Sequence, residues 1–133
     1  MDFTTIGTVW GPRVLSLLRI VSGLLLLQYG LAKLVGWPAV EMFKNLQWFS
    51  LFGVAGMFEL IGGTLTILGL LTRPVSFVLS GEMAAAYFIE HFPHSFFPMI
   101  NRGDLAVSLC FTFFYLAFAG GGAWSLDAIR GKA

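Results

Sequence analysis

Charged side chains are scarce in this sequence, at 11% of its 133 residues, whereas soluble domains carry about a quarter. Hydrophobic residues make up 57%, which is more than a soluble fold of this length can bury. The scarcity of charge therefore argues against a soluble domain and predicts a protein whose outer surface faces lipid. The net charge of only +1 provides no broad basic surface, so no nucleic-acid partner is expected.

Cysteine is nearly absent as well. Cys110 is the single one, so an internal disulfide or a dithiol pair is excluded, and no Cys/His cluster indicates zinc. His91 and His94 are spaced to share a metal ion, but no third ligand is signalled. We therefore expect histidines that handle protons or lie at the interface, and neither a metal nor a haem. No flavin, haem or iron–sulfur signature is present, so no intrinsic cofactor is predicted.

Segments that alternate between apolar and polar residues, as β-strands do, are also missing. The chain instead holds four apolar stretches, each close to the roughly 20 residues that cross a bilayer. The expected helices span residues 14–35, 49–71, 74–92 and 104–120, with Asn101 or Asp104 capping the last. The predicted fold class is all-α: a polytopic membrane protein, folded as an antiparallel four-transmembrane-helix bundle in one domain, 1–133.

Lysine and arginine are distributed unevenly between the two expected sides of the membrane. Four belong to the side that holds both termini and three to the other: Arg13, Arg73, Arg130 and Lys132, against Lys33, Lys44 and Arg102. Because cytoplasmic loops carry the excess of positive charge, this count predicts that both termini are cytoplasmic.

Three ionisable side chains fall deep inside the expected helices, where a charge is costly. Arg19 shares its face with two glycines, Glu59 lies among glycines of the second helix, and Glu82 lies on the third. Helical rise places Arg19 and Glu82 at overlapping depths. We therefore predict that Arg19 pairs with Glu82, with Glu59 close enough to share it. Such groups either fix helix register or line a pocket or proton path.

A second set of candidates lies toward the expected outer surface, where Lys33 and Glu90 are grouped with Arg102 and Asp104. His91 lies beside them. Tyr115 falls on the polar face of the fourth helix, and that face is expected to turn toward the bundle centre, where its hydroxyl could bond a ligand. The candidates for ligand binding or proton relay are therefore Arg19, Glu59, Glu82, Tyr115, Lys33, Glu90 and His91.

The second helix is unusually rich in glycine, which allows close helix packing in lipid. It carries more glycines than one contact needs, and this favours self-association as a homodimer. The residues concerned are Gly53, Gly56, Gly62, Gly63 and Gly69.

The same segments resemble the DoxX family of small bacterial membrane proteins over nearly the whole chain. The matching motifs are Arg19–Gly23 with Gln28–Leu34, Glu59–Gly63 with Gly69–Arg73, Asn101–Leu105 and Gly120–Asp127. Asp104 stands where the family usually has glutamate. The resemblance implies four helices in a bacterial inner membrane and a place in redox or quinone-related systems, although fold transfers better than function.

We therefore expect a membrane subunit of a redox system that binds a quinone or a similar lipophilic molecule and docks a partner oxidoreductase. Electrons would come through that partner or through the ligand. Any catalytic role of the chain would therefore be that of a component of an enzyme and not of a complete enzyme. A small transporter or permeation protein is the first alternative. A non-catalytic scaffold that assembles other membrane subunits is the second.

Overall fold

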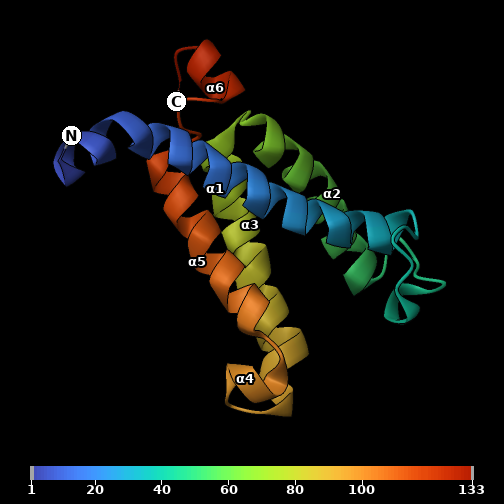
Figure 1. Cartoon of the computed structure of the whole chain (residues 1–133). Coiled ribbons are helices and arrows are strands. Elements are labelled where there is room, and N and C mark those ends of the chain that lie inside the picture. Colours follow the sequence, from blue (N-terminus) through green and yellow to red (C-terminus); the bar gives the residue numbers. More distant parts are fainter. Residues whose placement is uncertain (1, 133) are drawn as a thin grey trace.

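The computed structural model describes residues 2–132 and contains helices but no strand in that range. The all-α prediction is therefore confirmed. Four long helices correspond to the four expected segments (Figure 1): α1 (Phe3–Leu34), α2 (Leu51–Leu68), α3 (Thr72–Ala86) and α5 (Asp104–Ala119). Five short elements connect or follow them: η1 (Glu41–Phe43), η2 (Tyr87–His91), η3 (Phe92–His94), α4 (Pro98–Asn101) and α6 (Leu126–Ile129).

Two of these helices, α1 and α2, are long and apolar enough to cross a membrane. The helix α5 is apolar but shorter, at 16 residues. The helix α3 has 15 residues and continues without a break into the π-helical turn η2. The side chains of α1 and α2 that face away from the protein are large and apolar, among them Leu24 and Ile61. That pattern suits a surface covered by lipid.

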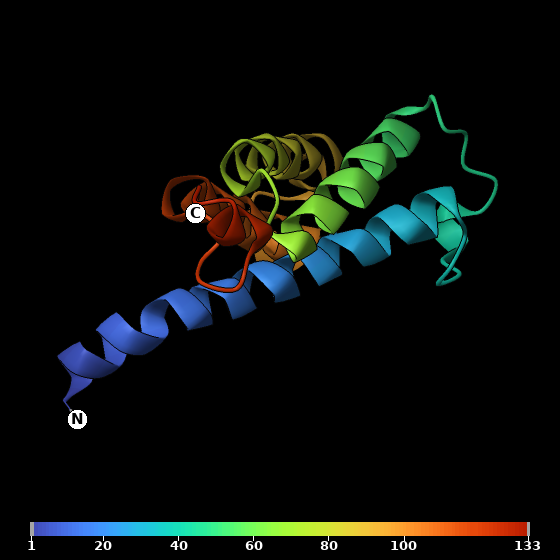
Figure 2. The same cartoon turned by 90° about the horizontal axis from the view of Figure 1, so that it is seen from above.

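The helix α1 begins much earlier than predicted, at Phe3 instead of residue 14. Asp2 caps it by accepting a hydrogen bond from Thr5 N at 2.8 Å. Pro12, which was expected to precede the helix, lies inside it and costs one backbone hydrogen bond. As a result the first turns of α1 extend beyond the other helices (Figure 2).

The turn between α2 and α3 is as short as the expected bounds 49–71 and 74–92 imply, but α2 ends earlier than residue 71. Gly69 ends it, in the left-handed conformation (φ 69°) that glycine adopts without strain. Thr72 begins α3, and Pro74 lies in its first turn, where a missing N–H costs nothing. The two helices therefore form a tight hairpin.

The segment between α3 and α5 also differs from prediction. The α-helical part of α3 ends at Ala86, and the π-helical turn η2 precedes Pro93, which had been expected to end the helix. Neither Asn101 nor Asp104 caps α5, because Gly103 occupies the cap position without a side-chain bond. Asn101 Oδ1 instead accepts from Gly103 N at 2.8 Å. Gly120 ends α5 as predicted.

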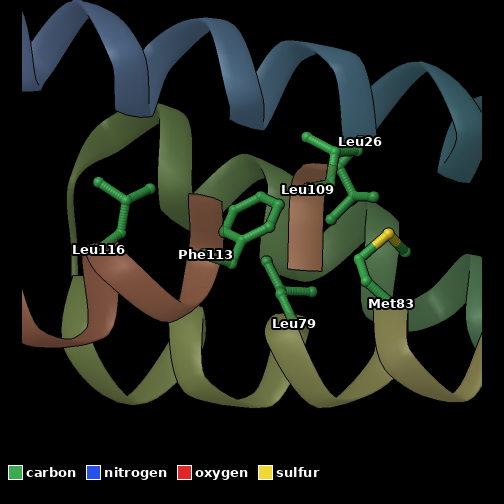
Figure 3. Packing of buried hydrophobic residues seen from close by; sticks show 6 residues of the cluster. All are labelled: Leu26, Leu79, Met83, Leu109, Phe113 and Leu116. Carbon is green, nitrogen blue, oxygen red and sulfur yellow. The ribbon is translucent and has the colours of Figure 1, made fainter. Parts of the chain in front are cut away.

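The long helices pack as two pairs, α1 with α2 and α3 with α5, joined by the α2–α3 hairpin. The pairs cross instead of running side by side: α3 and α5 are seen nearly end-on in Figure 2, while α1 and α2 lie across the view. In Figure 1 the pairs meet near the α2–α3 turn and separate toward their other ends. The apolar core fills the crossing (Figure 3) with Leu26, Leu79, Met83, Leu109, Phe113 and Leu116.

Glycines set the distance between α1 and α2, as predicted from their faces. A Cβ on Gly30 would stand 2.5 Å from Leu60 N, and one on Gly63 would stand 3.0 Å from Leu27 N. Contacts within the chain also account for the glycines that were expected to be spare. All five glycines between 53 and 69 are buried against other parts of this chain. The argument for a homodimer from a spare glycine face is therefore wrong.

The expected inward face of α5 is also wrong. Tyr115 is 58% exposed, and Asp104 and Ser108 are exposed too. The buried face carries larger apolar side chains, including Leu109 and Phe113. Hydroxyl groups do not force a helix face inward, because they can bond to their own helix: Thr112 Oγ1 donates to Ser108 O at 2.8 Å.

Candidate functional site

The central ion pair joins the two helices of the first pair. Lys33 Nζ of α1 lies 2.8 and 2.9 Å from the two carboxylate oxygens of Glu59 on α2. Both side chains are at least nine-tenths buried, with 9% and 4% of their surface exposed. A Cβ on Gly56 would approach Lys33 Cβ to 2.9 Å, so glycine at 56 leaves room for the lysine stem. Glu59 is thus neutralised by Lys33, and its predicted sharing of Arg19 is wrong.

The side chain of Glu82 reaches the same place from α3. It lies within the range of charge interaction with Glu59 and Lys33. Both of its carboxyl oxygens are buried, and no hydrogen bond of normal length reaches them within the part of the chain that the structure describes, although Glu59 lies close enough to share a proton with Glu82. Buried polar atoms are rarely left without a partner, and an unsatisfied one costs about 1–3 kcal/mol. Glu82 is therefore incompletely satisfied by this chain and can hydrogen-bond a ligand.

Aromatic rings surround the ammonium group of Lys33. Its Nζ lies 5.9 Å from the ring centroid of Tyr29, 5.3 Å from that of Phe43 and 5.9 Å from that of Phe52. These distances allow cation–π attraction, which is stronger away from water. The rings and the carboxylate of Glu59 together hold the lysine in one position.

These groups line a cavity of about 720 Å³ between the two separating helix pairs. Most of its wall is apolar, with Leu26, Met83 and Leu109 among the lining residues. A largely apolar cavity with a few converging polar groups is the usual form of a small-molecule site. The polar groups in this one are Tyr29, Lys33, Glu59, Glu82, Glu90, His91, His94, Asn101 and Arg102.

The predicted outer candidates lie at the η2–α4 part of this cavity. Glu90, His91 and Arg102 all line it, although Asp104 does not. His91 Nδ1 lies 3.0 Å from Asn101 O, so a backbone carbonyl fixes the orientation of this ring. Lys33, which had been assigned to this outer group, belongs instead to the ion pair with Glu59.

Arg19 is not part of the cavity, and its predicted pairing with Glu82 is wrong. The guanidinium is 1% exposed and donates to backbone carbonyls: to Thr66 O at 2.9 Å, to Trp124 O at 2.7 Å and to Ile67 O at 3.4 Å. It also donates to Gly121 O. Carbonyls at the end of a helix carry partial negative charge and lack helical partners. Arg19 therefore fastens the end of α2 to the C-terminal segment.

Ser16 and Asp127 extend this fastening. Trp124 N donates to Ser16 Oγ at 2.9 Å, while Leu71 N and Thr72 N each donate to an Asp127 carboxylate oxygen at 2.9 Å. Asp127 thereby caps α3 from the C-terminal segment. Burial raises the pKa of Asp127, but these N–H groups outweigh it, so the pKa lies below its usual value.

One register of α1 against α2 explains both changes of partner. Where Gly30 packs against Leu60, the antiparallel pair brings Lys33 to Glu59 and Arg19 to the end of α2. The sequence carried a signal for this register in the glycines at 23, 30, 56 and 63. Depths estimated from approximate helix ends could not resolve it, because an error of one turn moves a side chain by about 5.4 Å.

Among the described residues, no group of three or more histidine, cysteine or acidic side chains is placed to hold a metal ion. Tyr115, the remaining predicted candidate, lies on the exposed side of α5 and does not line the cavity. The cavity offers one ammonium group, one guanidinium group, three carboxyl groups and two imidazoles. Such a set can donate and accept hydrogen bonds and transfer protons.

The DoxX family model matches residues 14–92, which include both members of the ion pair and Glu82. An uncharacterized protein of Haemophilus influenzae is 40% identical over 120 residues, which cover 87% of this chain and 90% of that protein. An uncharacterized membrane protein of Mycobacterium tuberculosis is 26% identical over 140 residues, which cover 88% of this chain and 81% of that protein. No solved structure matches the chain.

Proposed function

Because this chain belongs to the DoxX family, we propose that it is a four-span protein of a bacterial inner membrane. Its cavity binds a quinone or a similar lipophilic molecule, and it serves as a subunit of a redox system. The bacterial relatives, one of them named as a membrane protein, support the location. The carboxyl group of Glu82, buried in the cavity and incompletely satisfied by this chain, is the observation that carries the ligand-binding proposal.

The lengths of the helices allow four spans, which also require the two crossing helix pairs to tilt in opposite directions in the bilayer. The continuous helical segment 72–91 is about 30 Å long and α5 is about 24 Å long, at 1.5 Å per residue. A bilayer core is about 30 Å thick, and a shorter helix is accommodated by local thinning. Lysine and arginine predominate on the side of the termini, which supports cytoplasmic termini.

The chemistry of the cavity suits the head of a quinone. Lys33 Nζ has three N–H donors, and it donates two hydrogen bonds to the carboxylate of Glu59. The third donor can bind a quinone carbonyl. Glu82 can accept a bond from a quinol hydroxyl. Reduction of a quinone consumes two electrons and two protons. A partner oxidoreductase would supply the two electrons. Glu82 would pass on one proton at a time and would be reprotonated from water through Glu90 and His91, which line the same cavity.

The test is to purify the protein in mild detergent and quantify bound quinone by extraction and mass spectrometry. Glu82→Gln removes the ionisable group with little change in size. Glu41→Gln is the matched control, because Glu41 is exposed and does not line the cavity. We expect quinone with the wild type and the control and a several-fold loss with Glu82→Gln. A wild type that carries no quinone, even after reconstitution with excess quinone, contradicts the proposal.

A proton permeation function is the second candidate, because ionisable side chains continue beyond Glu82 along the cavity wall. Glu90, His91, His94 and Arg102 follow it toward η3 and α4. Proton flux in liposomes that contain no quinone, abolished by Glu82→Gln, would favour this function. Native mass spectrometry of the same preparation tests for a partner oxidoreductase and for a second copy of the chain.

A further inference from the structure

An apolar groove runs along the outer side of the α2–α3 hairpin. It encloses about 580 Å³, and every residue that lines it is apolar or glycine. Several of its side chains are well exposed, including Phe58 at 47%, Ile61 at 62% and Leu71 at 49%. The groove extends along α2 from Val54 to Leu65, which is about 17 Å at the helical rise. A chain of that shape, without polar groups, fits it.

The groove adjoins the cavity that holds Lys33, Glu59 and Glu82. Val54 and Phe58 of α2 and Val78 of α3 line both spaces, so these three side chains stand between the groove and the cavity. Polar groups capable of hydrogen bonding lie on the cavity side, and none lines the groove. The two adjoining spaces therefore offer a polar end inside the protein and an apolar end that faces the lipid.

We propose that the groove binds the hydrocarbon tail of the ligand whose polar head occupies the cavity, and that the ligand enters sideways from the bilayer between α2 and α3. This inference rests on the proposed ligand-binding function and narrows the ligand to molecules with a long apolar tail. Val54, Phe58 and Val78 form the passage between head and tail. The shared wall with the polar cavity favours a tail over a helix of a second copy, because a flexible chain can pass between these three side chains and a helix cannot.

The experiment compares two radiolabelled benzoquinones with the same head, one without a tail and one with a decyl tail. Binding is measured at equilibrium with the full chain in lipid nanodiscs. Val78→Trp fills the passage. Val21→Trp is the matched control, because Val21 is 53% exposed and Val78 49%, and Val21 lines neither space. Both variants meet the same lipid, so partition of the tailed probe into the bilayer cancels between them.

We expect Val78→Trp to weaken binding of the tailed benzoquinone by about tenfold or more, which is the size that overpacking of a filled site produces. Binding of the tailless probe should weaken by a smaller factor, because Val78 also lines the head cavity, and retained binding of that probe shows that Val78→Trp is folded. Val21→Trp should bind both probes as the wild type does.

Other outcomes separate the two proposals. If both probes bind and Val78→Trp affects neither, the head site stands and the tail groove is wrong. If Val78→Trp leaves both affinities unchanged but alters the oligomeric state in native mass spectrometry, the groove belongs to a second copy and the tail proposal is wrong. If neither probe binds to the wild type, both proposals fail. If Val78→Trp loses both probes, Val78→Phe, which adds less volume, must weaken the tailed probe more than the tailless one, or the proposal fails.

Discussion

Replacement of Arg19 by alanine tests the fastening between α2 and the C-terminal segment. The guanidinium donates to four backbone carbonyls, and alanine removes every one of these bonds. Two of the acceptors keep another donor: Thr66 O accepts from Gly69 N at 3.1 Å, and Gly121 O accepts from Ser16 Oγ at 3.1 Å. The carbonyls of Ile67 and Trp124 would lose their recorded side-chain donor.

The expected loss of stability follows from that count. An unsatisfied buried carbonyl costs about 1–3 kcal/mol, and loss of the packed arginine stem adds to the cost of two such groups. We therefore expect Arg19→Ala to lower the free energy of unfolding by about 3–5 kcal/mol, which is a large effect for one substitution. Arg13→Ala is the control on the same helix. Arg13 donates to Val9 O and lies over the exposed ring of Trp10, so its removal should cost about 1 kcal/mol or less.

Reversible unfolding in mixed micelles, followed by circular dichroism, measures both values. Hydrogen exchange adds a local readout, because faster exchange should be concentrated in the C-terminal segment. The double variant Arg19→Ala/Glu82→Leu should be no more stable than Arg19→Ala alone, apart from any independent effect of Glu82→Leu. Recovery of stability in the double variant would show that Arg19 and Glu82 are partners and would refute the assignment to backbone carbonyls.

Three further predictions concern packing, pH and topology. Gly30→Ala should destabilise the protein by about 1–3 kcal/mol, because the added Cβ meets Leu60. Gly7→Ala, which has open space around it, should stabilise α1 slightly. Equal effects of the two substitutions in thermal unfolding would disprove the close contact at Gly30. Because the pKa of Asp127 is lowered in the folded state, its contribution to the free energy of unfolding should be constant above about pH 4 and lost as the pH falls below that value. The free energy of unfolding of Asp127→Asn, measured across the same pH range, should lack this acid-induced loss. A reporter fused to the C-terminus should be active only in its cytoplasmic form, and periplasmic activity would reverse the orientation.

Local chemistry accounts for the parts of the fold that the sequence predicted. Long apolar stretches indicated four helices, since in lipid the backbone must satisfy its own hydrogen bonds. The end of α5 at Gly120 followed from the conformational freedom of glycine, whereas the end of α2 at Gly69 was not predicted. The start of α1 was missed because a proline preceded by glycine usually marks a helix boundary, while here Pro12 lies inside the helix and Asp2 provides the cap.

The sequence by itself determined that this protein is helical, that its outer surface suits lipid, and that Arg19, Glu59 and Glu82 needed partners inside it. Their identity as costly buried groups depends only on residue type and burial. Which groups meet was decided by the tertiary structure alone. The register of α1 against α2 places Lys33 beside Glu59 and Arg19 beside backbone carbonyls. The crossing of the two helix pairs leaves the cavity around Glu82. The register and the crossing both depend on how side chains of one helix pack between those of another. The periodicity within a single helix carries no information about this packing.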